Sequence, residues 1–207
     1  MTNFQTKDYP LVERYTVGYR NFERADLRAA QLFKVQLLGA RLCWADLTDA
    51  HLQFANLDEA DLTGAMMWRS HLDRSSLKLA NLHKAVLIRA SAKAANFSGA
   101  TLHRADLRLA NLRGANFAGA NLRGAKLAYS HLAGADLTGA DLTGADLTGA
   151  DLTGATVDAC CWRSAVLSRA KLDSSRVHSE RIKAEQMIEL KAEQTIEQSK
   201  QTLLTAL

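Results

Sequence analysis

An apolar residue occupies every fifth position of this 207-residue chain, from Phe22 to Val177. Between Leu27 and Leu172 that residue is leucine except at Met67, Ala92, Phe97, Phe117, Val157 and Trp162. Alanine usually stands two residues earlier, and Asp or Asn is the commonest choice one residue earlier, so the unit reads Ala-(Asp/Asn)-Leu-x-x. A period of five matches neither an α-helix nor a strand. The pattern therefore predicts a solenoid built from many copies of one small unit.

The five-residue unit also predicts the shape of the solenoid. If Leu and Ala point inward, four units complete a square coil of twenty residues, and neighbouring coils stack at roughly 4.8 Å. On that rise, residues 20–177 form about eight coils and a rod roughly 38 Å long. Alanine suits the narrow core because close packing leaves no room for a larger side chain. All of the twelve glycines except Gly18 end a unit, where a tight corner favours the conformational freedom of glycine.

These repeats closely resemble those of pentapeptide repeat proteins, particularly the cyanobacterial type. The resemblance covers about three quarters of the chain and implies an all-β solenoid, a right-handed quadrilateral β-helix. Residues 11–15, followed by Gly18, Arg20 and Phe22, resemble the short N-terminal helix that precedes the first coil in many bacterial members. Pro10 suits the first turn of that helix and Gly18 suits its end.

The chain divides into three predicted segments. Residues 1–19 are a capping segment with a short helix, residues 20–177 are the β-helix, and residues 178–207 are a C-terminal α-helix. The last segment has no Gly or Pro, alternates Glu with Lys, and carries an apolar stripe at Ala184, Ile188, Ala192 and Ile196. Three roles stay open for this helix: capping the rod, covering an apolar surface, or mediating self-association.

Composition favours a single soluble domain, since 47% of the residues are hydrophobic and no stretch approaches the roughly 20 apolar residues of a membrane span. The N-terminus lacks the apolar core of a signal peptide, so we expect a cytoplasmic protein with no membrane association. Cysteine usage agrees with this expectation. Cys43 and Cys161 lie six coils apart, too far for a disulfide.

The net charge of +4 bears on nucleic-acid-related functions. Some pentapeptide repeat proteins bind gyrase and resemble acidic duplex DNA, but a rod with an excess of Lys and Arg does not imitate phosphate. The basic residues are spread over several faces and interleaved with Asp, whereas DNA binding favours a clustered basic track. The charge and its distribution therefore disfavour both DNA mimicry and duplex binding.

Candidate catalytic and metal sites are weak. Asp136, Asp141, Asp146 and Asp151 look like a carboxylate cluster, yet their five-residue spacing places one on each face of a coil, where each would hydrogen-bond local backbone. Two histidine pairs stack one coil apart, but two His and one acid on a flat surface are too few to indicate a metal site. These pairs are His51 with His71, beside Asp73, and His83 with His103. We predict no enzyme activity, no metal and no cofactor.

One outward patch is apolar where most of the exterior is polar, and the same change occurs in two units of neighbouring coils. In residues 65–69 and 85–89, which lie one coil apart, the residues on both sides of the inward position are apolar. A contiguous group containing Trp, Met and Arg has the composition of an interface centre. The predicted interaction patch comprises Trp44, Met66, Trp68, Arg69, Val86, Ile88 and Arg89, with Leu109 and Tyr129 further along the same corner.

These observations favour a non-enzymatic protein-interaction scaffold or regulatory module that presents a rigid surface to a protein partner. Two alternatives stay open. One is a DNA-mimic-like protein that interacts with a topoisomerase, which the positive charge disfavours. The other is a self-assembling structural rod, including a homodimer formed through the patch or the C-terminal helix.

Overall fold

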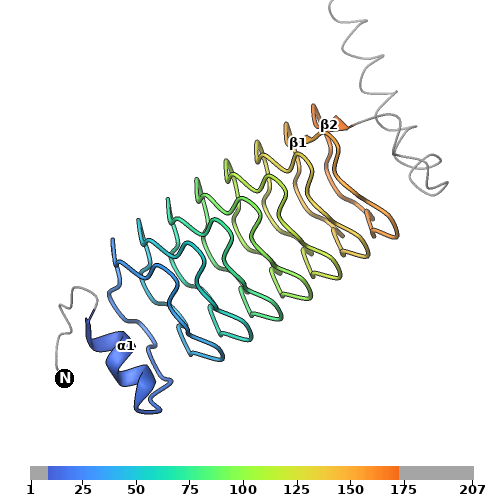
Figure 1. The fold of residues 1–207 in the computed structure, drawn as a ribbon. Coiled ribbons are helices and arrows are strands. Elements are labelled where there is room, and N and C mark those ends of the chain that lie inside the picture. The colour runs from blue at the N-terminus through green and yellow to red at the C-terminus, as the bar shows by residue number, and fades with distance from the viewer. Residues whose placement is uncertain (1–8, 173–207) are drawn as a thin grey trace, which may run out of the picture.

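The computed structural model describes residues 9–172, and their side chains from Leu11 onward. The described part begins with helix α1, Tyr9–Thr16, and continues as a stack of coils to strands β1, Asp151–Leu152, and β2, Lys171–Leu172 (Figure 1). Between α1 and β1 the sides of the coils are joined by isolated parallel bridges. Each side of a coil is too short for a longer strand, because a corner follows within five residues.

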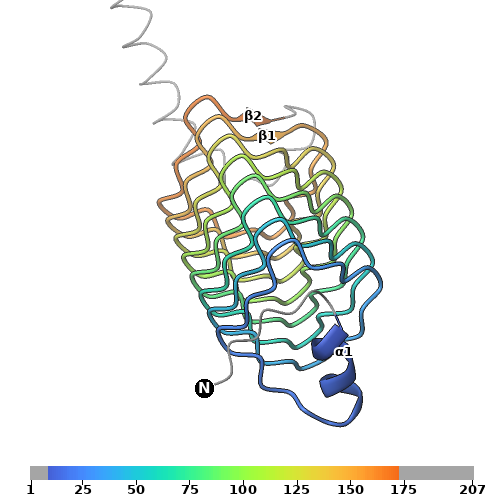
Figure 2. The same ribbon diagram turned by 90° about the vertical axis from the view of Figure 1, so that its left-hand side faces the viewer.

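The register between coils is constant. Every isolated bridge joins residues twenty apart, from Asn21 with Arg41 to Asp146 with Val166, and β1 pairs with β2 at the same offset. The Leu27 amide donates to the Asp46 carbonyl at 2.8 Å, and the Asp46 amide donates to the Ala25 carbonyl at 2.9 Å. Figure 2 shows the coils following one another with a common outline. The predicted coil of twenty residues is confirmed.

The inward-facing leucines and alanines fill the core as the repeat predicts, and between Leu32 and Leu152 each of them is at most 2% exposed. The Phe97 and Phe117 rings stack inside it with centroids 4.8 Å apart and planes 2° apart. Serine replaces alanine at three buried positions. The hydroxyls of Ser70 and Ser75 donate to backbone carbonyls, whereas the Ser130 hydroxyl has no partner within residues 9–172.

The corners explain where glycine occurs. The last residue of every unit from Arg24 to Arg169 has a φ between +53° and +70°. A hydrogen bond closes each corner, as from the Ala30 amide to the Leu27 carbonyl at 3.1 Å. A turn with positive φ at its third residue favours glycine. Most corners nevertheless carry a side chain, including Trp44 and Ala94, so the coil imposes this conformation on residues that disfavour it.

Helix α1 covers the N-terminal end of the core through Leu11, which is 5% exposed. The helix ends at Thr16, and Gly18 follows with a φ of +95°. The Tyr19 amide then donates to the Arg14 carbonyl at 2.9 Å, which satisfies a carbonyl of the last turn. The short N-terminal helix is confirmed, while the C-terminal helix predicted for residues 178–207 lies outside the described residues.

Candidate protein-interaction surface

Four apolar side chains meet on one face of the rod and form what we call the Trp68 patch: Met66, Trp68, Val86 and Ile88. Met66 forms a parallel bridge with Val86, and the Arg69 amide donates to the Ile88 carbonyl at 3.1 Å. Met66 is 45% exposed and Trp68 is 40% exposed, while Val86 and Ile88 are half-buried. The structure therefore places these four residues side by side on the exterior, where the sequence predicted them.

The direction of these side chains follows from the residue between each pair. Met67 and Leu87 are completely buried, so the residues on both sides of them point outward. The Met67 amide donates to the Val86 carbonyl at 2.7 Å, which holds the two units in register. The patch therefore lies on backbone that is fixed by ladder hydrogen bonds and by the core beneath it.

Trp44 extends the patch at the preceding corner. Its indole ring lies directly against Gly64 of the next coil, and a Cβ added to Gly64 would come within 2.3 Å of that ring. Gly64 immediately precedes Ala65 and Met66, so the indole borders the apolar strip. Trp44 is 51% exposed. Trp44 therefore packs on the coil that carries Met66 and Trp68.

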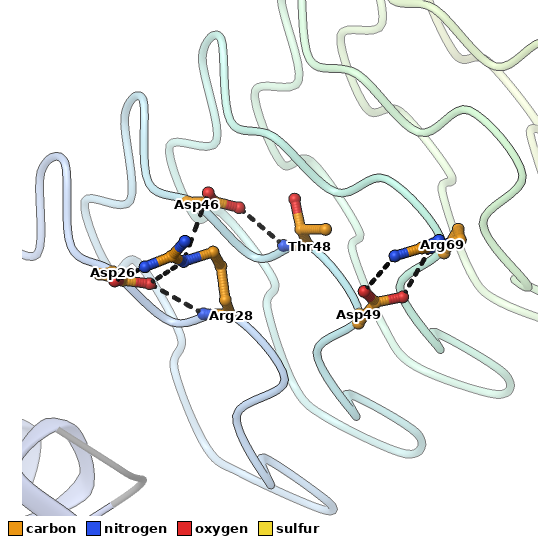
Figure 3. Close-up of polar contacts among 6 residues, drawn as sticks. All are labelled: Asp26, Arg28, Asp46, Thr48, Asp49 and Arg69. Atoms are coloured by element: carbon orange, nitrogen blue, oxygen red, sulfur yellow. Dashed lines mark hydrogen bonds and ion pairs between the residues drawn. The ribbon is translucent and has the colours of Figure 1, made fainter. Parts of the chain in front are cut away.

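Arg69 is held in place at the edge of the patch. Its Nε donates to Asp49 Oδ1 at 2.8 Å and its Nη2 donates to Asp49 Oδ2 at 2.6 Å (Figure 3). The same guanidinium lies 4.3 Å from the centroid of the Trp68 ring. This hydrogen-bonded Arg69 lowers the pKa of the Asp49 carboxyl below its usual value. Arg69 thus fixes the orientation of Trp68 instead of projecting freely from the rim.

Polar coils bound the patch along the rod. Towards the N-terminus, Asp46 accepts a hydrogen bond from the Thr48 amide at 3.0 Å, and Arg28 pairs with Asp26 at 2.5 Å (Figure 3). Towards the C-terminus, Arg108 pairs with Asp106 at 2.8 Å. These carboxylates and guanidiniums satisfy one another. In the columns of Met66 and Trp68, the apolar strip therefore ends within one coil in each direction.

Arg89 differs from Arg69 because it has no carboxylate partner among the described residues. It is exposed at the corner next to Arg69, one coil further along. Leu109 and Tyr129 follow on the same corner and are 46% and 52% exposed. Arg89 is thus the cation at the patch that is open to an acidic group of another molecule.

The other residues singled out from the sequence do not form a chemical site within residues 9–172. Each carboxylate of the Asp136 to Asp151 series accepts a hydrogen bond from the backbone amide two residues later, as predicted. The ring pairs stack as predicted, with centroids 4.8 Å apart for His51 and His71 and 5.3 Å apart for His83 and His103. No group of three metal-ligating side chains occurs in the described part of the chain.

The three cysteines are free thiols. Burial raises the pKa of Cys160 to about 12 and that of Cys43 to about 11. The Cys160 thiol donates to the Leu137 carbonyl, which fits its place at an inward corner. At neutral pH these two thiols are protonated and unreactive.

The structure shows a second exposed cluster that was not predicted from the sequence. Phe33 and Phe54 contact each other edge to face, with ring centroids 5.6 Å apart and planes at 73°. Lys34 lies over the Phe33 ring and Arg74 over the Phe54 ring. We call these four residues the Phe33–Phe54 surface. Phe33 and Phe54 are 21 residues apart, so a comparison of positions twenty apart does not pair them.

The repeats identify the family. The family model described as "Pentapeptide repeats" matches in eight copies, over residues 20–49, 55–91, 75–114 and 115–154. The chain belongs to the pentapeptide repeat family. Pentapeptide repeat proteins form right-handed β-helices, which agrees with the predicted fold class.

Solved structures of other pentapeptide repeat proteins resemble this one. QnrB1, a plasmid-mediated fluoroquinolone resistance protein in trypsin-treated form, is 24% identical with a TM-score of 0.67, and the match covers 75% of this chain and 78% of QnrB1. HetL, involved in heterocyst differentiation regulation in the cyanobacterium Nostoc sp. strain PCC 7120, is 27% identical with a TM-score of 0.43, and the match covers 78% of this chain and 92% of HetL. No curated protein matches the chain.

The rod is a convex scaffold with a continuous core and a patterned exterior. No helix within residues 9–172 is long and apolar enough to cross a membrane. Two of the surface features that depart from the polar exterior of the repeat are the Trp68 patch and the Phe33–Phe54 surface, and each is a contiguous group of exposed apolar side chains.

Proposed function

We propose that this pentapeptide repeat protein is a non-enzymatic scaffold or regulatory module that presents the Trp68 patch to a protein partner. The observation that carries the proposal is the contiguity of Met66, Trp68, Val86 and Ile88 on the exterior of two adjacent coils. Polar or charged residues occupy most of the equivalent positions elsewhere on this face, such as Asp46, so the fold does not require apolar side chains there.

The physical properties of the patch support a binding role. A patch on ladder-bonded backbone loses little conformational entropy when it binds, which leaves more of the contact energy as affinity. Trp and Arg are the residues that most often dominate interface energy. Trp68 is already oriented by Arg69, and Arg89 supplies a cation for a carboxylate at the edge of the interface.

The test compares wild type with a variant that restores a polar exterior, Trp68→Asp combined with Ile88→Thr. Val166→Thr is the matched control, because Val166 occupies the column of Met66 and Val86 and is 47% exposed. Proteins captured from a native lysate are identified, and the purified partner is titrated against all three proteins. Loss of a central Trp contact corresponds to 2 kcal/mol or more, so we expect about a thirtyfold weaker Kd for the double variant.

Stability and mass distinguish the alternatives. Met67 and Leu87 are unchanged in the double variant, so its melting temperature should stay close to that of wild type. A much lower melting temperature with unchanged partner binding would instead indicate that the chain itself covers the patch. A change of oligomeric state in sedimentation, without loss of a partner, would indicate a self-assembling rod.

A further inference from the structure

The face that carries the Phe33–Phe54 surface is distinct from the face of the Trp68 patch. Its outward residues flank the inward positions 32, 52, 72, 92 and 112, in coils joined by the bridges of Gln31 with His51, His51 with His71, and onward to Asn111. These residues therefore form one continuous surface, and the aromatic pair lies at its N-terminal end.

Both phenyl rings are strongly exposed. Phe33 is 55% exposed and Phe54 is 42% exposed, although the two rings contact each other. Phe54 also has a φ of +59°, at a corner where many units carry glycine. An exposed phenylalanine in a conformation that disfavours side chains does not serve the fold, because glycine would relieve the strain without disturbing the core.

The charge on this face is strongly one-sided. Its outward positions include four cations, Lys34, Arg74, Lys93 and Arg113. Within the five coils of residues 31–114, the one carboxylate on this face is Asp73, which accepts hydrogen bonds from the Ser91 hydroxyl at 2.6 Å and the Lys93 amide at 2.9 Å, and pairs with Lys93 Nζ at 3.8 Å.

Two of these cations flank the aromatic pair. Lys34 Nζ lies 5.1 Å from the Phe33 centroid, and the Arg74 guanidinium carbon lies 5.7 Å from the Phe54 centroid. Neither forms an ion pair with a carboxylate in the described part of the chain. The aromatic pair is therefore bordered by positive charge that no acidic group within residues 9–172 neutralises.

We propose that the Phe33–Phe54 surface binds an acidic segment of a partner protein. An aliphatic or aromatic side chain of that segment contacts the two phenyl rings, and flanking carboxylates pair with Lys34 and Arg74. Electrostatic complementarity of this kind sets specificity and speeds association. This inference goes beyond the proposed function, since it concerns a different face and different residues from the Trp68 patch.

An acidic protein segment fits this surface better than single-stranded nucleic acid, which carries negative charge as well. Bases bind aromatic platforms by stacking on open ring faces. Here Phe33 and Phe54 meet edge to face, and a cation already lies over each ring. The exposed ring edges suit contact with a side chain, and the cations suit carboxylates.

The experiment measures fluorescence anisotropy of a labelled peptide in which Glu and Leu alternate. A peptide with Lys in place of Glu and a labelled single-stranded oligonucleotide are the comparison probes. The variants are Phe54→Gly and the pair Lys34→Gly with Arg74→Gly, with Arg169→Gly as control. All four positions have a φ between +55° and +60°, so glycine is tolerated by the backbone and each variant should fold.

We expect the Glu-Leu peptide to bind wild type and the control equally. Phe54→Gly should weaken binding about tenfold, as for a central apolar contact. The Lys34→Gly, Arg74→Gly variant should also bind more weakly, and its residual binding should depend less on salt. Circular dichroism melting confirms that each variant is folded.

Several results would overturn the proposal. Undetectable binding of the Glu-Leu peptide, equal binding of the Lys-Leu peptide, or unchanged affinity of Phe54→Gly would exclude an acidic ligand at this surface. Preferential binding of the oligonucleotide would assign it to nucleic acid. Tighter peptide binding after deletion of residues 2–8 would assign it to the chain's own N-terminal segment, and a smaller sedimenting species for Phe54→Gly would assign it to a second copy of the chain.

Discussion

The coils of residues 21–110 and those of residues 111–155 share one backbone but differ in what they display. The corners have a positive φ in both regions, from +53° to +65° in the first and from +58° to +70° in the second. In residues 111–155 the corner residue is glycine everywhere except Tyr129, whereas in residues 21–110 glycine occupies the corner only at positions 39, 64 and 99. Side chains at corners are therefore not required by the fold, and the first region carries them at a conformational cost.

The exposed apolar residues follow the same division. In residues 111–155, Tyr129 is the one large hydrophobic residue that is exposed. The first region exposes many, and both proposed binding surfaces lie within it. The second region is therefore close to a minimal solenoid. The first region is the same solenoid with large apolar side chains added to its exterior.

The largest effect should come from overfilling the shared core. Ala60→Leu and Ala145→Leu insert extra volume at completely buried positions, one in each region, and should each destabilise the rod by roughly 3 kcal/mol. Asp146→Leu adds the same side chain on the outside and should cost about 1 kcal/mol, through the lost hydrogen bond to the Thr148 amide. Thermal melting compares the three. Equal melting temperatures for Ala145→Leu and Asp146→Leu would contradict the inward register.

A smaller effect should separate two glycine corners. Gly64→Ala must displace the Trp44 ring and adopt a φ of +63°, so we expect a loss of roughly 2 kcal/mol. Gly139→Ala meets open space and should lose only about 1 kcal/mol, from the backbone conformation alone. Denaturant titration measures both.

A double-mutant cycle provides the control for this pair. In a Trp44→Gly background, Gly64→Ala should cost no more than Gly139→Ala, because the ring is gone. An unchanged cost would mean that Trp44 does not pack tightly on Gly64, and the patch would then lose its extension along the corner.

The buried serines offer a third contrast between the regions. Ser130→Ala should stabilise the protein by about 1 kcal/mol, since its buried hydroxyl has no partner within residues 9–172. Ser70→Ala removes a hydroxyl that donates to the Met67 carbonyl at 2.8 Å, so it should not stabilise. Chemical denaturation of the two variants checks the difference in sign. Destabilisation by Ser130→Ala would show that this hydroxyl is hydrogen-bonded.

The smallest effect should come from relieving one strained corner. Ala94→Gly removes a Cβ at a φ of +53° and should stabilise by about 0.5 kcal/mol, after the greater flexibility of glycine in the unfolded chain is subtracted. Ala133→Gly, on the same face but one residue before a corner, should destabilise by about 0.5 kcal/mol. Melting temperatures measured side by side decide the matter. A loss of stability in both variants would show that the corners carry no strain.

Much of the fold could be predicted because each five-residue unit has the same inward and outward positions. The spacing of five placed the inward Leu and Ala positions, and the period of twenty placed Met66 beside Val86. The stacked Phe97 and Phe117 rings and the contact of Trp44 with Gly64 also follow from a constant register, because equal positions lie in straight columns.

Contacts between side chains that stand in different columns could not be predicted in this way. Phe33 and Phe54 occupy different positions of the unit, and the direction of each ring at the corner brings them together. Arg69 pairs with Asp49 in its own column, but its guanidinium also lies over the Trp68 ring in the neighbouring column. Such pairings depend on side-chain rotamers, which the repeat does not specify.

The constant offset of twenty residues between bridges has a consequence for how this protein can change in length. Insertion of a single residue would move every later Leu out of the core. Insertion of one five-residue unit would keep the core, but every residue after the insertion would move to the next face of the rod. Surface residues on the two sides of the insertion would then no longer lie in the same columns. Duplication of a whole coil preserves both, and therefore evolution can lengthen such a rod in steps of twenty residues while its surfaces keep their alignment.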